Sequence, residues 1–221
     1  MIFRRKAKNE EEPGFFGAET DVETDADAGA ADVAGGPFDS TEVEPELLEA
    51  DDRIDLGALN ITGLPGMELR LQVDEQSGAV QAILLVLEES ALELRAFAAP
   101  KKSGIWDEVR QEIADEANRM GGSATEAEGP FGTELVLVVP VEDPDGKIYS
   151  QTSRVIGVDG PRWLLRATVL GRAAVDAEAA PPLEETLRKV VVVRGTEPMA
   201  VRESLPLTLP PGSEPIEPEE G

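Results

Sequence analysis

Apolar and polar residues alternate along two stretches in the middle of the chain, residues 67–74 and 91–98. A period of two predicts half-buried β-strands, because successive side chains of a strand point to opposite faces. Residues 79–87, between these stretches, are almost wholly apolar, which predicts a strand buried on both faces. Short turn sequences join the three strands, so the pattern predicts an antiparallel meander.

The apolar spacing then changes to three and four residues, which predicts an amphipathic helix over residues 104–120. Ser103 stands where an N-cap is expected, and Gly121–Gly122 ends the helix. The residues expected on its buried face are Ile105, Trp106, Val109, Ile113, Ala117 and Met120.

Three further strands are predicted over residues 134–141, 147–158 and 162–170, with turns at 143–146 and 159–161. A second helix begins at about Pro182 and gives way to the β-branched run Val190–Val193. The order is βββ-α-βββ-α, and turns join the strands in place of crossover helices. We therefore expect an α+β fold, a mainly antiparallel sheet with two helices packed on it.

The charge of the chain divides it into three parts. Its 221 residues carry 20 Lys+Arg and 45 Asp+Glu, a net charge of −25. Residues 9–52 hold 16 acids and no base, and residues 210–221 hold four acids and no base. Both segments have too few large apolar side chains to offset the entropy of ordering. We expect a disordered segment 1–52 with a basic start, one α+β domain over 53–209, and a disordered Pro/Glu tail over 210–221.

Residues 45–59 leave two readings open, because their leucines and isoleucine fit a short helix and an extended lead-in equally well.

Missing residue types exclude several functions. The chain has no His and no Cys, which rules out thiol enzymes, disulfide scaffolds, zinc fingers and catalytic triads that need histidine. Its negative charge argues against direct nucleic-acid binding. No glycine-rich nucleotide loop occurs, and the acids of 142–146 fit a turn better than a cation site, so we expect no cofactor and no metal. No apolar run approaches the length of a membrane span, and we expect a cytoplasmic protein.

Four residues form the candidate site. Arg154, Arg162 and Arg166 lie on the two strands that flank the turn at 159–161, so strand pairing would bring them together, and Tyr149 lies on the first of these strands. Clustered arginines hold carboxylates or phosphates through paired hydrogen bonds. The alternative, which the pattern favours, is that the arginines pair with acids of the same domain and that Tyr149 lies on a solvated sheet face.

The chain resembles an uncharacterised actinobacterial family, a domain of unknown function. The resemblance rests on 159–166 (DGPRWLLR), 182–184 (PLE), 190–195 (VVVVRG) and 197–199 (EPM). It implies an acidic N-terminal segment, a compact domain over most of 40–210 and a Pro-rich tail, and it transfers no catalytic residue, cofactor or partner. The topology is similar to that of secretion-chaperone-type α+β domains.

Three functions fit these observations. The first is a non-catalytic, cytoplasmic protein-interaction domain, adaptor or chaperone-like, with acidic tails and a protein partner. The second is a small-molecule-binding domain or an enzyme that uses the arginines with carboxylates. In the third, the acidic segment competes with nucleic acid for a basic partner. The absence of histidine and of any nucleophile motif favours the first and argues against an enzyme.

Overall fold

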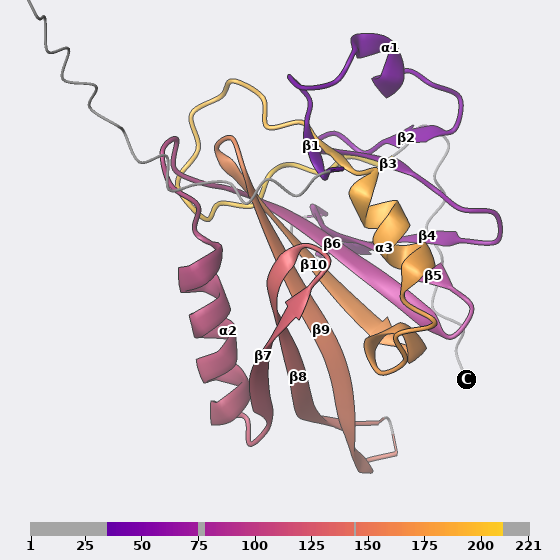
Figure 1. The fold of residues 1–221 in the computed structure, drawn as a ribbon, viewed down its shortest axis with the longest axis vertical. Coiled ribbons are helices and arrows are strands. Elements are labelled where there is room, and N and C mark those ends of the chain that lie inside the picture. The colour runs from indigo at the N-terminus through magenta and orange to yellow at the C-terminus, as the bar shows by residue number, and fades with distance from the viewer. Residues whose placement is uncertain (1–34, 75–77, 144, 210–221) are drawn as a thin grey trace, which may run out of the picture.

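A seven-stranded antiparallel sheet forms the main body of the protein (Figure 1). The computed structural model describes residues 35–74, 78–143 and 145–209. The strands lie in the order β4-β5-β6-β10-β9-β8-β7. In chain order they are β4 (Glu68–Val73), β5 (Val80–Leu87), β6 (Ser90–Ala98), β7 (Ser123–Gly129), β8 (Gly132–Glu142), β9 (Ile148–Gly160) and β10 (Trp163–Gly171). The expected α+β fold with a mainly antiparallel sheet is confirmed.

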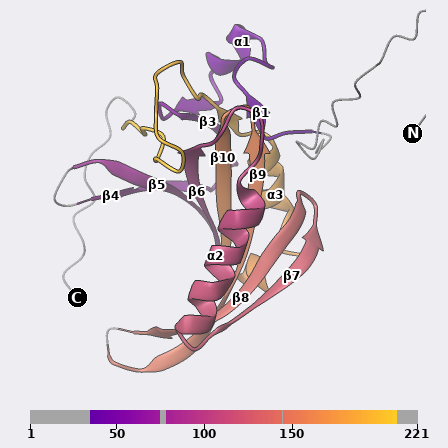
Figure 2. The ribbon, with the colours of Figure 1, turned by 90° about the vertical axis from the view of Figure 1, so that its left-hand side faces the viewer.

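Two helices cover opposite faces of this sheet, α2 (Trp106–Arg119) and α3 (Pro181–Arg188) (Figure 2). Successive residues of β9 enter different cores: Val155 packs with α2, whereas Ile156 packs with α3. The same alternation in β10 sends Leu164 to the α2 side and Leu165 to the α3 side. β9 and β10 are therefore apolar on both faces where the helices cover them, as expected of strands between two layers.

A second, four-stranded sheet lies at one end of the main sheet, in the order β1-β11-β3-β2. Its strands are β1 (Phe38–Asp39), β2 (Arg53–Asp55), β3 (Leu59–Thr62) and β11 (Val191–Val192). Helix α1 (Pro45–Leu48) precedes β2, so residues 45–59 contain both a short helix and extended chain. A short 3₁₀ turn, η1 (Arg172–Ala174), follows β10.

The structure differs from the expected disorder up to residue 52. β1 pairs in parallel with β11, and the Trp163 indole Nε1 donates a 2.6 Å hydrogen bond to the buried Asp39 carboxylate. The sequence around Asp39 does not show this, because its partners lie more than 120 residues further along the chain. The predicted disorder of 1–34 and 210–221 falls outside the described residues.

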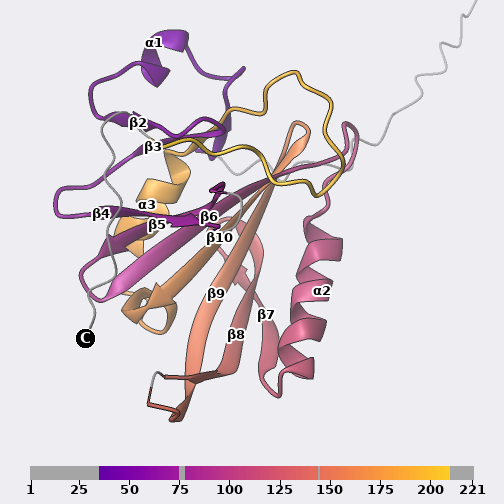
Figure 3. The same cartoon turned by 180° about the vertical axis from the view of Figure 1, so that it is seen from behind.

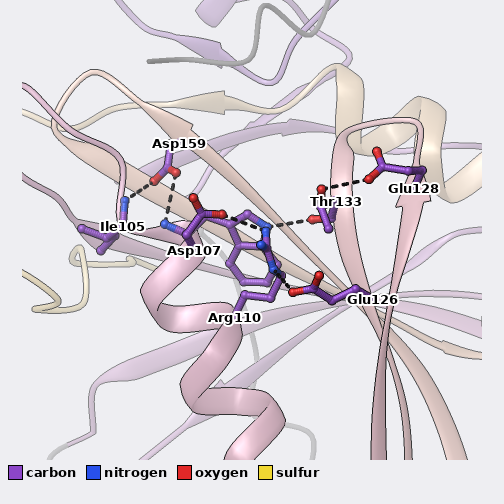
Figure 4. A network of polar contacts seen from close by, with 8 residues as sticks. Ile105, Asp107, Arg110, Glu126, Glu128, Thr133 and Asp159 are labelled. Carbon is purple, nitrogen blue, oxygen red and sulfur yellow. Dashed lines mark hydrogen bonds and ion pairs between the residues drawn. The ribbon is translucent and has the colours of Figure 1, made fainter. Parts of the chain in front are cut away.

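A side chain of strand β9 caps the start of helix α2, and the prediction of Ser103 as N-cap is wrong. The N-cap is Ile105, and no side chain within the helix caps it. Asp159 on β9 does so instead: its Oδ1 accepts from the Ile105 N–H at 2.8 Å, and its Oδ2 accepts from the Trp106 N–H at 3.1 Å (Figure 4). A side chain at Gly104 would overlap this carboxylate.

Trp106 then fixes the first turn of α2 against the sheet. Its indole ring lies directly on the backbone of Gly157, where any side chain would overlap the ring. Its Nε1 donates to the Thr133 carbonyl at 2.8 Å, and the Arg110 guanidinium lies 5.9 Å from the ring centroid while bonding Glu126 (Figure 4). The helix is thus tied to β7, β8 and β9 at once.

Two details of this region differ from the sequence prediction. Strand β7 was not predicted, because its sequence SATEAEG is small and acidic and has no apolar alternation. Met120, expected on the buried face of the helix, stands at its C-cap and is 52% exposed.

Among the described residues, the longest helix falls well short of the length and apolarity that a membrane span requires.

Replacing the remote cap tests its contribution. We expect Asp159→Ala to lower the free energy of unfolding by about 1–2 kcal/mol, because two helix N–H groups lose their acceptor. Ser103→Ala is the matched control and should change stability by less than about 0.5 kcal/mol, since it removes no capping hydrogen bond. Urea denaturation monitored by circular dichroism measures both, and equal losses in the two variants would contradict the assignment of the cap.

Candidate functional site

The structure places the four candidate residues at four separate positions. Arg154, on β9, points to the α3 side of the sheet, as does its neighbour Ile156. Arg166, on β10, stands directly opposite Gly157, and the Trp106 ring lies where a Gly157 side chain would be, so Arg166 points to the same, α2 side. The sequence correctly placed both residues on paired strands, but their opposite parity puts them on opposite faces.

Arg154 is held by two acids of the same domain. Its Nε donates to Glu134 Oε1 at 2.7 Å, and its Nη2 donates to Glu134 Oε2 and to Glu184 Oε1, each at 3.0 Å. All three side chains are at most 13% exposed. The hydrogen bond to Glu134 raises the pKa of Arg154, burial lowers it, and the further interactions with both carboxylates raise it again. This arrangement fastens α3 to β8 and β9.

Arg162 occupies the tight turn between β9 and β10. Its φ of +67° lies in the left-handed region. Its backbone carbonyl accepts from the Ala99 N–H at 2.8 Å and from the Arg194 Nε at 3.1 Å. The turn follows Gly160 and consists of Pro161 and Arg162, slightly later than the sequence indicated.

Tyr149 lies near the opposite end of β9. Eight residues separate it from Gly157, the cross-strand partner of Arg166. At about 3.3 Å per residue this is roughly 26 Å, too far for a shared small-molecule site. The structure therefore does not bring Tyr149, Arg154, Arg162 and Arg166 into one cluster.

Tyr149 instead belongs to an end of the β8–β9 hairpin that extends beyond the rest of the sheet (Figures 1 and 3). Pairing of β7 with β8 ends at Val138, and pairing of β10 with β9 ends at Arg154. Residues 139–143 and 145–153, here named the projecting hairpin, are therefore two strands whose outer edges pair with no further strand among the described residues. An isolated two-stranded ribbon is marginally stable in water, so a segment of this kind gains from being covered.

Helix length explains why this end is left uncovered. α2 has 14 residues and spans about 21 Å at 1.5 Å per residue. β9 has 13 residues and spans about 43 Å at 3.3 Å per residue. A helix that starts beside Asp159 thus reaches only about half-way along the strand.

The projecting hairpin carries apolar side chains on both faces. Val139, Val141 and Tyr149 lie on the α2 side, and Pro140 and Ile148 lie on the other. Ile148 is 68% exposed and Tyr149 is 48% exposed. The exposed Met120 at the end of α2 precedes Gly122, whose backbone lies against Val138 and Val139. Strand alternation and apolar exposure thus produce a two-sided contact surface.

The edge and the tip of the projecting hairpin, unlike its faces, carry proline and acidic residues. Pro140 lies on the free edge of β8 and lacks an N–H, which disfavours the addition of a further strand there. At the tip, Asp143 Oδ1 accepts from the N–H groups of Asp145 and Lys147 at 3.0 and 2.8 Å. The acids of this turn shape the hairpin, as the turn interpretation of residues 142–146 predicts.

Two other features of the described residues have some of the properties of a site. A cavity of about 250 Å³ lies at the β5–β6 turn, between Leu87, Ser90, Arg172 and Leu183, and its rim includes three glutamates. The only salt bridge of Arg172 among the described residues is with Asp176, at 2.9 Å. Within the described ranges, acidic side chains form no group of three or more that could hold a metal ion.

Sequence reasoning missed Ile148 and Met120 as surface residues. Met120 follows the apolar spacing of the helix, and that spacing assigns it to the core; Ile148 begins a strand whose next residues are mostly polar, so the pattern gives no sign of its exposure. The length mismatch between α2 and β9 is the signal that could have identified them, because it leaves the strand ends without a covering helix.

A family model described as a protein of unknown function, DUF3710, matches residues 36–215, which is most of the chain. The search of curated proteins found no match.

The engagement of Arg154 predicts a large loss of stability on its removal. Arg154→Met should lower the free energy of unfolding by about 3–5 kcal/mol, because Glu134 and Glu184 would stay buried without a counter-charge. The control Arg119→Met removes an exposed pair with Glu116 and should cost less than about 1 kcal/mol. Urea denaturation compares the two, and a loss for Arg154→Met no larger than that of the control would refute the structural role.

Proposed function

This chain belongs to the DUF3710 family, whose function is unknown, and we propose that it is a non-catalytic protein-interaction domain, adaptor or chaperone-like, that binds its partner through the projecting hairpin. One observation carries the proposal: the hairpin extends beyond the covered sheet with Ile148 68% and Tyr149 48% exposed. Its cytoplasmic location and the choice of a protein as partner are parts of the same proposal.

Burial energetics support a protein partner. Burying a large apolar side chain contributes about 1.5–3 kcal/mol, and the hairpin offers such side chains on two faces. Tyrosine and methionine are enriched at the centres of protein interfaces, and both Tyr149 and Met120 lie on the α2 side of this surface. An apolar groove that encloses the ribbon would cover both faces together.

The negative charge of the hairpin tip indicates which residues we expect around the groove of the partner. Glu142, Asp143 and Asp145 carry three negative charges against the one positive charge of Lys147, and the whole chain is at −25. A groove with basic residues at its rim would complement this tip and speed the encounter at low salt. We therefore propose a basic partner protein with an apolar groove.

The structure supports neither of the other two functions considered from the sequence. Arginine–carboxylate chemistry at all four candidate residues has no support, because Arg154 is bound by two carboxylates of its own domain and the four side chains lie apart. Competition with nucleic acid by the acidic segment concerns residues that fall largely outside the described ranges.

Substitution of the hairpin tests the proposed function. The full chain and its Ile148→Ser/Tyr149→Ser variant are immobilised and exposed to a native cytosolic extract at low and at physiological salt. We expect a stoichiometric partner on the wild-type chain and at least a tenfold loss on the variant, because two anchoring side chains are removed. Capture should also weaken as salt rises, if the charged rim contributes.

Val175→Ser is the matched control, because Val175 is 69% exposed and lies after η1, outside the hairpin. Retention of the partner by the control and its loss from the hairpin variant would support the proposal. Absence of any stoichiometric partner, or equal loss in both variants, would refute it. Sedimentation of the purified chain tests for self-association. If the chain is a dimer and Ile148→Ser/Tyr149→Ser dissociates it, the hairpin binds a second copy of the chain, and the proposed basic partner is overturned.

A further inference from the structure

A group of charged side chains lies on the part of the α2-side sheet face that α2 leaves open, far from the projecting hairpin. Figure 2 shows this part between α2 and the β4–β5 hairpin. We name it the arginine face, and its residues are Gln72, Glu93, Arg95, Phe97 and Arg166.

Arg166 has no hydrogen-bond partner among the described residues. Its Nε is buried and unpaired, and its nearest carboxylate, that of Glu93, lies 3.8 Å from Nη2, beyond hydrogen-bond distance. A guanidinium has five N–H donors, and leaving such a group unsatisfied away from water is costly. Arg154, on the opposite face, by contrast donates three hydrogen bonds to two carboxylates.

The neighbours of Arg166 make its position less favourable still. Arg95 stands directly opposite it on β6, and like charges at facing positions of a sheet destabilise each other. Burial lowers the pKa of Arg166, Arg95 lowers it further, and Glu93 raises it. The arginine face therefore holds two cations against one carboxylate in a protein whose total charge is −25.

The other residues of the face hold both arginines in place. Arg95 donates to Glu93 at 2.9 Å and to Gln72 at 3.1 Å, and Gln72 donates to Glu93 at 3.4 Å. The Arg166 guanidinium lies over the Phe97 ring, 5.6 Å from its centroid. Glu93 already has two donors, so it is not free to rotate towards Arg166 without losing them.

We propose that the arginine face binds a small oxyanion, a phosphate or a carboxylate, with Arg166 as the main donor and Arg95 beside it. The oxyanion would supply the acceptors that Arg166 lacks and the negative charge that separates the two guanidinium groups. Because the Arg166 and Glu93 side chains are only 25% and 16% exposed, a compact ligand fits this opening better than a protein surface. The site is independent of the projecting hairpin and of the function proposed for it.

Titration of the full chain tests the proposal with two probes, inorganic phosphate and citrate, each at constant ionic strength adjusted with NaCl. The readout is the Nε–Hε resonance of Arg166 in ¹⁵N spectra, assigned by its loss in Arg166→Met. We expect a saturable shift with at least one probe, and the probe that binds more tightly identifies phosphate or carboxylate as the preferred group. Arg166→Met should weaken binding at least tenfold, measured by calorimetry.

Arg70→Met is the control, because Arg70 lies on β4, two residues before Gln72, is 53% exposed and pairs with Glu68. It should bind both probes as the wild type does. Without anion, Arg166→Met should unfold at the same or a higher temperature than the wild type, because a partly buried charge without a hydrogen bond is removed from its place opposite Arg95. The proposal fails if neither probe shifts the resonance, if the two variants bind equally, or if Arg166→Met is strongly destabilised without anion, since Arg166 would then have a structural role.

Discussion

The need to cover both faces of β9 and β10 determines where the other elements of this protein lie. Val155 and Leu164 on one face, and Ile156 and Leu165 on the other, are all buried. Each such side chain contributes about 1.5–3 kcal/mol only if water is excluded from its own side of the sheet. One helix cannot cover both sides, so α2 and α3 occupy opposite faces. Each helix is held to the strands by polar contacts in its first turn.

The same alternation gives two arginines on neighbouring strands opposite environments. Arg154 points under α3 and meets two carboxylates, and its buried charge is balanced within the domain. Arg166 points to the open part of the α2 side and faces another arginine. Stability alone explains the first arrangement and not the second. The buried Nε of Arg166 has no acceptor, and its guanidinium stands opposite a like charge, so this position contributes less to folding than that of Arg154 does.

Helix and strand geometry leaves one end of the long hairpin without cover. A helix rises 1.5 Å per residue and a strand about 3.3 Å, so elements of similar residue number differ twofold in length. The uncovered end carries Ile148 and Tyr149, and its free edge carries Pro140. Exposed apolar side chains combined with an edge that resists strand addition favour docking through side chains over sheet extension.

The local pattern of apolar and polar residues was enough to place most strands of the main sheet. Alternation placed β4 and β6, the apolar run placed β5, and spacing placed α2, because each depends on neighbours within a few residues. The same reasoning placed Arg154 and Arg166 on paired strands. It missed β7, whose small and acidic residues have no pattern of their own. It also missed β1, whose pairing partner lies some 150 residues away.

Composition determined the excluded chemistry, since a chain without His or Cys cannot use either residue wherever it folds. Only the tertiary structure decided which side chains meet. Asp159 caps a helix whose N-cap residue lies 54 residues before it, a contact that Ser103 and its neighbours do not indicate. Whether an arginine is saturated or unpaired, and whether a methionine or isoleucine is buried or exposed, depends on which element covers it. Sequence pattern records the face on which a side chain lies, and the lengths and positions of the packed elements decide what covers that face.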